Sequence, residues 1–280
     1  MVRATVAEAA ASATVASPHS ADAMQDIPEF LAPTHWRCVD FISDLHLCAA
    51  MPKTFSAWAG YMQGTSAQAV FILGDLFEVW VGDDECDLPF EARCIEVLRH
   101  SAATRHVSLM VGNRDFLLGE SMHAQAGTYP LADPVCLALG NARLLLTHGD
   151  ALCLSDTDYQ AFRKVVRSQA WQAQLLRQSL DERLAIAAKL RSNADSRKRY
   201  DGAQFADVDP AAAVSWLDLS GASAMIHGHT HRPGSNALAP QLMRHVLSDW
   251  DLDNGPQPRA QVLRWTRSGL VRITPQQACE

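Results

Sequence analysis

Short apolar runs, each closed by a polar motif, recur five times along the chain. The runs are rich in Val, Ile and Leu and are bounded by Gly or Asp, a pattern typical of buried strands. They span residues 39–42, 70–73, 107–111, 144–147 and 224–226. Because the carboxyl ends of strands line the ligand crevice in α/β proteins, we expect the polar motifs to meet at one rim.

The motifs carry Asp, His and Asn, which are side chains that bind metal ions. They read Asp44-Leu45-His46, Gly74-Asp75, Gly112-Asn113-Arg114-Asp115, His148-Gly149-Asp150 and His227-Gly228-His229-Thr230-His231. Oxygen ligands suit hard divalent cations and imidazole suits mid-row metals. Taken singly, an Asp after a strand is more often a helix cap. Seven donors after five strands instead predict two metal ions that share Asp75, since a carboxylate can bridge.

The pattern changes after the fourth motif. From residue 156 to about 207 we find no strand pattern, and apolar residues four apart predict a helix face. They are Leu176, Leu180, Leu184 and Ala188. Because this stretch lies between the fourth and fifth motifs, we interpret residues 156–207 as a helical cap inserted into the core domain.

Charge sets the same stretch apart. The chain carries a net charge of −7, yet residues 163–199 hold ten Lys or Arg and only three acids. Such a run is typical of a solvated helix face, and equally of a face that binds anionic lipid headgroups or an anionic substrate. The acidic balance elsewhere argues against a surface built for nucleic acid.

Composition bounds the remaining possibilities. With 280 residues, 48% of them hydrophobic, the chain is long enough for one large domain, which we place at residues 36–280. Seven scattered cysteines without a Cys-x-x-Cys pair favour a reducing cytosol. The sequence has no apolar run long enough for a transmembrane helix. Residues 1–35 are rich in Ala, Ser and Thr, and we expect a disordered tail rather than a signal peptide.

The five-motif set resembles the calcineurin-like metallophosphoesterases over roughly residues 37–235. The resemblance implies an α+β fold of two packed mixed β-sheets flanked by helices, and hydrolysis of phosphoesters with two metal ions. It implies that the first metal is held by Asp44, His46, Asp75 and His231. It implies that the second metal is held by Asp75, Asn113, His148 and His229.

The third motif indicates which class of phosphoester is the substrate. Many members of this family carry His after the Asn, where it is thought to protonate the leaving oxygen, whereas this chain has Arg114. A phosphate leaving group needs no such proton, because its second pKa is near 6. Arginine can instead fork onto phosphate oxygens. Arg114 therefore favours a diphosphate substrate, and the alternative is a structural pair with Asp115.

Longer segments are similar to one branch of this family, the UDP-2,3-diacylglucosamine diphosphatases of lipid A assembly. These segments are residues 74–84, 112–119, 148–153, 159–163, 228–233 and 246–250. The resemblance implies Mn²⁺ as the cofactor and an acylated UDP-sugar as the substrate. The products would be UMP and 2,3-diacylglucosamine 1-phosphate (lipid X), formed at the cytoplasmic face of the inner membrane. No nucleic acid and no obligatory protein partner are expected.

The resemblance also assigns roles to individual residues. It implies that Arg114 and His229 stabilise the reacting phosphate. Candidate substrate-binding residues are Asn113, Arg114, Asp156, Arg191, Asn193, Lys198 and His229. The acids of residues 78–84 are expected to start a helix, with Trp80 and Trp171 packed as structural aromatics.

Two alternatives stay open at this point. One is another soluble phosphodiesterase, nuclease or nucleotide diphosphatase that uses the same metal centre. The other is a scaffold that binds partners without catalysis, although scaffolds usually show broken ligand sets and all seven donors are present here.

Overall fold

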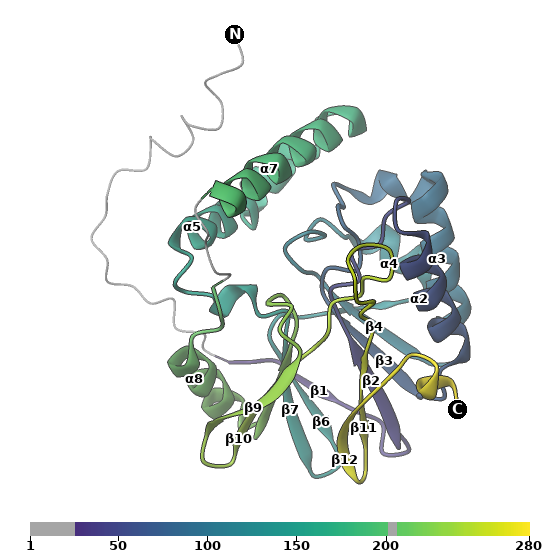
Figure 1. The fold of residues 1–280 in the computed structure, drawn as a ribbon, viewed down its shortest axis with the longest axis vertical. Helices are drawn as coiled ribbons and strands as arrows, with labels where there is room; N and C mark the ends of the chain where they lie inside the picture. The colour runs from purple at the N-terminus through teal and green to yellow at the C-terminus, as the bar shows by residue number, and fades with distance from the viewer. Residues whose placement is uncertain (1–25, 201–205) are drawn as a thin grey trace.

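Two six-stranded mixed sheets pack face to face in the computed structural model, which describes residues 26–200 and 206–280 and their side chains except 191–200 (Figure 1). The first sheet has the order β12-β11-β2-β3-β4-β5. Its strands are β2 (Cys38–Ile42), β3 (Ala69–Leu73), β4 (His106–Met110), β5 (Tyr129–Leu131), β11 (Val262–Thr266) and β12 (Gly269–Ile273). Strands β2 to β5 are parallel, so their carboxyl ends share one edge.

The second sheet has the order β1-β6-β7-β8-β10-β9. Its strands are β1 (Glu29–Leu31), β6 (Val135–Leu139), β7 (Ala142–Thr147), β8 (Ala224–His227), β9 (Gly234–Ala239) and β10 (Leu242–Val246). Strands β7 and β8 are parallel neighbours, with Leu146 in register with Ile226. The two motif-bearing strands of this sheet therefore also end at a common edge.

Alternate residues of each buried strand face different cores. Phe41 and Phe71 lie between the two sheets, against Leu146 and Ile226 of the facing sheet. The intervening residues, such as Ile72, face the helices that cover the outside of the first sheet. Because both faces of these strands are buried, the sequence reads as continuous apolar runs rather than as an alternating pattern.

Helices cover the outer faces of the sandwich. The first sheet is covered by α2 (Pro52–Gly64), α3 (Pro89–Ala102) and α4 (Glu120–Ala126), and the second by α8 (Pro210–Ser220). Short 3₁₀ helices are η1 (Asp83–Asp87), η2 (Asp150–Leu152) and η3 (Gln277–Cys279). Pro at the start of α2, α3 and α8 fits the first helical turn, where its missing N–H costs no hydrogen bond. The expected fold class is confirmed.

The cap consists of α5 (Thr157–Val166), α6 (Gln169–Leu175) and α7 (Leu180–Tyr200). In Figure 1, α5 and α7 lie away from the sheets, on the side of the loops that follow the strands. Within the described residues, no helix is both long enough and apolar enough to cross a membrane.

The predicted helix face through Leu176 is wrong in one respect, because the helix breaks there. Leu176 caps the end of α6 and is exposed, and a new helix begins at Leu180. The backbone N–H of Ser179 donates to Glu182 Oε2 at 3.0 Å, and the N–H of Glu182 faces Ser179 Oγ at 3.4 Å. This reciprocal capping box starts α7 and overrides the leucine spacing.

The predicted tail of residues 1–35 extends too far into the fold. Residues 1–25 lie outside the described residues, but Glu29–Leu31 form β1 and pair in parallel with β6. Phe30 packs edge-to-face on Phe71, with ring centroids 5.6 Å apart, and Trp36 is buried in the same core. Burial of these two aromatics orders a segment that its local composition would leave unstructured.

Candidate metal centre

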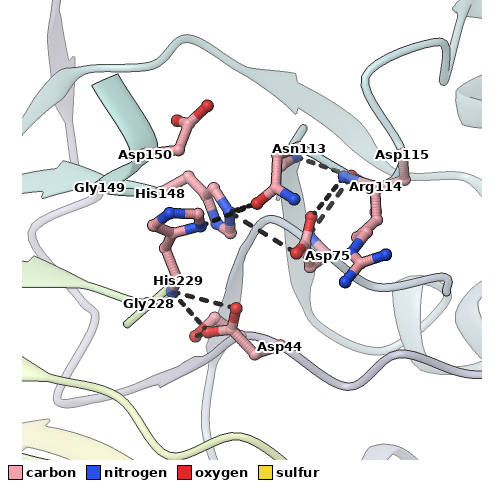
Figure 2. A network of polar contacts seen from close by, with 12 residues as sticks. Asp44, Asp75, Asn113, Arg114, Asp115, His148, Gly149, Asp150, Gly228 and His229 are labelled. Atoms are coloured by element: carbon pink, nitrogen blue, oxygen red, sulfur yellow. Dashed lines mark hydrogen bonds and ion pairs between the residues drawn. The ribbon is translucent and has the colours of Figure 1, made fainter. Parts of the chain in front are cut away.

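The five motifs meet at the carboxyl ends of five strands. Three come from the first sheet, after β2, β3 and β4, and two come from the second sheet, after β7 and β8. The structure brings all seven predicted ligands together at this junction, several of them in Figure 2. They are Asp44, His46, Asp75, Asn113, His148, His229 and His231.

The first predicted metal position is outlined by Asp44, His46 and His231, whose ligand atoms all lie within 4.8 Å of one another. His46 Nε2 lies 3.2 Å from His231 Nε2, and His231 Nε2 lies 3.4 Å from Asp44 Oδ1. His46 Nε2 is 3.9 Å from Asp75 Oδ2. One carboxylate pair and two imidazoles thus face a common point, a donor set that suits a mid-row divalent metal.

The second predicted position centres on His148. Its Nε2 lies 3.7 Å from Asp75 Oδ2 and 3.0 Å from Asn113 Oδ1. His229 Nδ1 reaches the same Asn113 oxygen at 2.8 Å. Asp44, Asp75 and His148 also form a group that could hold a metal, so Asp44 lies within reach of this position as well. The donor types present therefore suit metal binding at both positions, and the number of ions stays a prediction.

The backbone at these ligands adopts an uncommon conformation. Six non-glycine residues in the described chain have positive φ, and five of them are predicted ligands. These are Asp44 (52°), His46 (48°), Asp75 (52°), His229 (65°) and His231 (50°). Left-handed backbone is unfavourable for residues with a Cβ, and such strain gathers at functional sites. The positive φ values thus gather at the residues that are predicted to bind metal.

Glycines leave the space that the ligands occupy. A Cβ on Gly112 would lie 2.1 Å from Asp75 Oδ1, and a Cβ on Gly228 would lie 2.2 Å from Asp44 Oδ2. Gly74 combines a φ of +89° with a Cβ position 2.5 Å from His148 Nδ1. The glycine requirement is thus a matter of close approach as well as of backbone conformation.

Burial and charge perturb several pKa values. Burial opposes ionisation of Asp44, but His231, His148 and His46 outweigh it and hold the Asp44 pKa well below its usual range. Burial would lower the pKa of His148, yet Asp75 and Asp44 raise it to about 9. Strongly perturbed groups gathered at one rim are typical of a functional site.

His229 differs from His148 in the same cluster. Burial and the charge of His148 lower the His229 pKa to about 4. A neutral imidazole at this position is suited to metal coordination, which requires an unprotonated nitrogen.

Arg114 lies at the rim of the predicted metal centre, and its backbone N–H donates to Asp75 Oδ1 at 2.8 Å (Figure 2). The side chain of Arg114 faces Glu78, with Nη1 3.9 Å from Oε1. Asp115 is fully buried and instead accepts backbone N–H bonds from Gly112 at 2.7 Å and Leu76 at 2.7 Å. The structural Arg114–Asp115 pair does not occur in the described part of the chain.

Asp150 anchors the cap to the metal rim, a role that the sequence reading missed. Its buried carboxylate accepts from Tyr159 Oη at 2.5 Å and Arg163 Nε at 2.7 Å. Arg167, the residue directly after α5, donates to the carbonyl of Gly112 at 2.8 Å. The Tyr159 ring stacks beside His229, with centroids 5.9 Å apart. The base of the cap is therefore fixed directly against the predicted ligands.

The predicted cap contacts have different outcomes. Asp156 is exposed and caps α5 by accepting from the Tyr159 N–H at 3.0 Å, so its substrate-binding role stays a prediction. The side chains of Arg191, Asn193 and Lys198 lie outside those that the structure describes. Not all basic residues of the run 163–199 are available to bind a ligand or a membrane. Three of its ten cations, Arg163, Arg167 and Arg183, contact the core domain.

The acidic segment after Asp75 behaves only partly as expected. Asp83 and Asp84 begin η1, and Trp80 is buried against Phe77. Glu78 lies before this helix, and its carboxylate faces His46 and Arg114. Trp171 packs at the cap–core boundary near Phe116, as expected of a structural aromatic.

Comparison with known proteins supports the geometry. The model of the calcineurin-like phosphoesterase family matches residues 39–233. A protein from Bordetella pertussis named UDP-2,3-diacylglucosamine hydrolase is 39% identical to this chain, and the match covers 81% of this chain and 91% of that protein. The protein of the same name from Aromatoleum aromaticum is 40% identical, over 82% of this chain and 93% of its own length. The protein of the same name from Cellvibrio japonicus is 41% identical, over 75% of this chain and 90% of its own length.

Among solved structures, the phosphoesterase Yfce from E. coli superposes with a TM-score of 0.42 at 16% identity, over 86% of this chain and 94% of that chain. This likeness is too distant to add to the assignment. The family model and the relatives near 40% identity establish it, and the resemblance expected from the motifs is confirmed. The chain belongs to the calcineurin-like phosphoesterase family.

Proposed function

We propose that the chain hydrolyses the diphosphate bond of UDP-2,3-diacylglucosamine, giving UMP and 2,3-diacylglucosamine 1-phosphate for lipid A biosynthesis. The observation that carries this proposal is Arg114 at the rim of an intact set of metal-binding side chains, beside Asp75. A guanidinium there matches a substrate whose leaving group is itself a phosphate. The relatives at about 40% identity bear the name of this activity.

The chain's own residues would bind and orient the diphosphate. Arg114 presents a planar fork of donors that matches two phosphate oxygens. The amide of Asn113 and the imidazole of His229 lie 2.8 Å apart and face the same rim. Arg114 and His229 would stabilise the charge that develops on the phosphoryl oxygens, because the buried site needs little rearrangement to meet it.

We assign the metal ligands as the sequence predicts, with Asp44, His46, Asp75 and His231 at one ion and Asp75, Asn113, His148 and His229 at the other. When bound, two ions lower the pKa of a coordinated water and polarise the phosphoryl group. Carboxylate ligands suit Mn²⁺, and the resemblance to the UDP-2,3-diacylglucosamine diphosphatases favours it over other divalent metals. A comparison of Mn²⁺, Mg²⁺ and Zn²⁺ on metal-free protein tests this choice; full activity without added metal contradicts it.

The cap supports an acylated substrate. It lies on the side of the predicted metal centre and is tied to it through Asp150, so it can cover a ligand that lies across the rim. Leu154, Phe162, Val165 and Leu176 are exposed large apolar side chains in or beside the cap. Apolar and basic side chains on one element suit a surface that lies on an anionic bilayer.

A substrate comparison tests the proposal against a general phosphodiesterase. Efficiency is measured on UDP-2,3-diacylglucosamine and on bis(4-nitrophenyl) phosphate with the same metal-loaded protein. Clear preference for the acylated UDP-sugar supports the proposal, and efficient release of nitrophenol with an intact diphosphate overturns it. In ¹⁸O-water, label in UMP supports attack on the phosphorus of the UMP half, whereas label in the sugar phosphate contradicts that point of attack.

Membrane association has its own test. We expect the protein to sediment with vesicles that contain anionic phospholipid and to stay in solution with purely zwitterionic vesicles. Loss of sedimentation after Phe162→Ser and Val165→Ser would support docking through α5. Equal behaviour with both vesicle types contradicts an anionic membrane partner.

A further inference from the structure

The segment that carries Glu78 is pinned beside the first metal position by backbone contacts. After β2 and β3, the chain forms an isolated parallel bridge between Leu47 and Phe77. The N–H of Glu78 donates to the carbonyl of Leu47 at 3.2 Å, and the N–H of His46 donates to the carbonyl of Asp75 at 3.0 Å. The position of Glu78 relative to His46 is therefore fixed by the main chain, and does not depend on a flexible side chain alone.

The two oxygens of the Glu78 carboxylate face two different functional groups. Oε2 lies 3.1 Å from His46 Nδ1, and Oε1 lies 3.9 Å from Arg114 Nη1. The side chain is only 14% exposed, so solvent screens these contacts weakly. One carboxylate thus stands between an imidazole of the predicted metal centre and the guanidinium at its rim.

The contact with His46 has a definite chemical consequence. Nε2 of His46 is the ring atom that faces Asp75 and His231, whereas Nδ1 faces Glu78. A metal-bound imidazole carries its proton on the nitrogen away from the metal. A carboxylate at that nitrogen fixes the tautomer, orients the ring and makes the ligand more basic.

The other histidine of the same position has a comparable partner. His231 Nε2 faces Asp44 at 3.4 Å, and its Nδ1 lies 3.7 Å from Asp249 Oδ2. Both imidazoles of the first position are therefore backed by a carboxylate outside the ligand set. Glu78 differs from Asp249 in facing Arg114 as well.

We propose that Glu78 is a positioning residue that orients His46 for the metal and holds the Arg114 guanidinium toward the bound diphosphate. The backbone of Arg114 is fixed by Asp75, but its long side chain needs a second restraint to stay at the rim. At 3.9 Å the opposite charge of Glu78 biases the guanidinium without saturating its donors. The inference deepens the proposed function, and its His46 part concerns metal binding alone.

Two substitutions separate the two roles. Glu78→Gln keeps a side-chain oxygen that can face His46 Nδ1 but removes the charge that faces Arg114. Glu78→Ala removes both. The matched control is Glu96→Gln, because Glu96 is an exposed glutamate on α3, paired with Arg99 far from the rim. All variants are checked by circular dichroism and thermal unfolding before use.

The first readout is Mn²⁺ affinity without substrate, followed by the electron paramagnetic resonance signal of free Mn²⁺. We expect Glu78→Ala to weaken one of two sites by ~10- to 100-fold, the usual effect of losing a partner of a metal-bound histidine. We expect Glu78→Gln and Glu96→Gln to bind both ions as the parent does. Parental affinity in folded Glu78→Ala overturns the His46 part, whether or not the proposed substrate is correct.

The second readout is a double-mutant cycle on hydrolysis of the diphosphate at saturating Mn²⁺. We expect Glu78→Gln to lower kcat/KM by ~10-fold in the parent and to have no further effect in Arg114→Ala, because coupled residues are not additive. An equal loss in both backgrounds overturns the Arg114 part. A parent that leaves this diphosphate intact refutes the proposed function instead, while the Mn²⁺ titration still tests Glu78.

Discussion

The backbone N–H of Arg114 donates to Asp75 Oδ1 at 2.8 Å, so the proposed anion-binding residue and the proposed bridging carboxylate are fixed in one arrangement. We expect Arg114→Ala to lower kcat by ~100- to 1000-fold with unchanged metal stoichiometry, the range seen when a donor to a developing anion is removed. The kcat of Arg114→Lys should fall between those of the parent and Arg114→Ala, because lysine keeps the charge but lacks the planar fork of donors. Steady-state kinetics with metal analysis checks this, and near-parental turnover of Arg114→Ala would favour a structural role.

Close approach at Gly112 gives a second prediction. A methyl group there would lie 2.1 Å from Asp75 Oδ1, so Gly112→Ala must displace that carboxylate. We expect at least ~10-fold weaker metal binding, as for loss of an oriented ligand. Gly60→Ala is the matched control, because a Cβ at Gly60 in α2 meets nothing within 4 Å. Calorimetric Mn²⁺ titration distinguishes them, and equal affinities would show that Asp75 is not tightly confined.

The ion pair between Asp150 and Arg163 is predicted to fix the base of the cap to the core. Asp150→Asn removes the charge that pairs with Arg163, and breaking a buried pair typically costs ~3–5 kcal/mol. We expect faster hydrogen exchange in α5 and a raised KM, since the base of the cap loosens while the predicted metal ligands stay in place. Lys164→Gln, which removes an exposed charge from the same helix, should leave exchange unchanged. Unaltered protection of α5 in Asp150→Asn would mean that other contacts fix the cap.

A buried ion pair far from the rim is predicted to affect stability alone. Arg264 donates to Asp40 Oδ1 at 2.8 Å and Oδ2 at 2.9 Å, and Asp40 is fully buried. Arg264→Ala should lower the free energy of unfolding by ~3–5 kcal/mol, because it leaves a buried carboxylate without its cation. Exposed Arg267→Ala is the control. Urea unfolding measures the free energy of unfolding of both variants. If Arg264→Ala lost less stability than Arg267→Ala, the hydrogen bonds from Tyr61 and Thr65 would be sufficient to satisfy Asp40.

Glu85 predicts a pH dependence of stability. Burial, partly opposed by the N–H of Val81, raises its pKa from 4.5 to about 7. The folded state then binds more protons than the unfolded state between these values, so this group's contribution to stability falls as pH rises from 4.5 to 7. The effect is at most about 3 kcal/mol.

Glu85→Gln should remove that dependence, because the amide oxygen can still accept from Val81 and no charge is buried. We expect the difference in melting temperature, variant minus parent, to be larger at pH 8 than at pH 5. Parallel melting curves for the two proteins across this range would show that Glu85 ionises without cost.

The sequence predicted which side chains gather at one rim, because their signal repeats. Each of the five motifs closes a strand, and parallel neighbours such as β7 and β8 must deliver their ends to one edge. The candidate ligands therefore followed from strand ends and metal chemistry. Their backbone conformation, such as the positive φ of Asp44, was visible only in the structure.

The groups around the ligands could not be predicted in the same way. Glu78 reaches His46 because two loops are bridged at Leu47, a contact without a periodic signature. Asp150 follows the predicted ligand His148 closely, but its carboxylate turns to Arg163 in the cap. Strand β1 was missed because three residues are too few for an alternating pattern, and its order comes from pairing with β6. These features depend on long-range contacts rather than on local composition.

The predicted metal centre is proposed to split an acylated UDP-sugar at its diphosphate. The most direct test is phosphorus NMR of UDP-2,3-diacylglucosamine with Mn²⁺ and either the parent protein or Asp75→Asn. We expect the parent to convert the two diphosphate signals into those of UMP and 2,3-diacylglucosamine 1-phosphate, while Asp75→Asn leaves them intact. An unchanged diphosphate with the metal-loaded parent, or equal conversion by Asp75→Asn, would contradict the proposal.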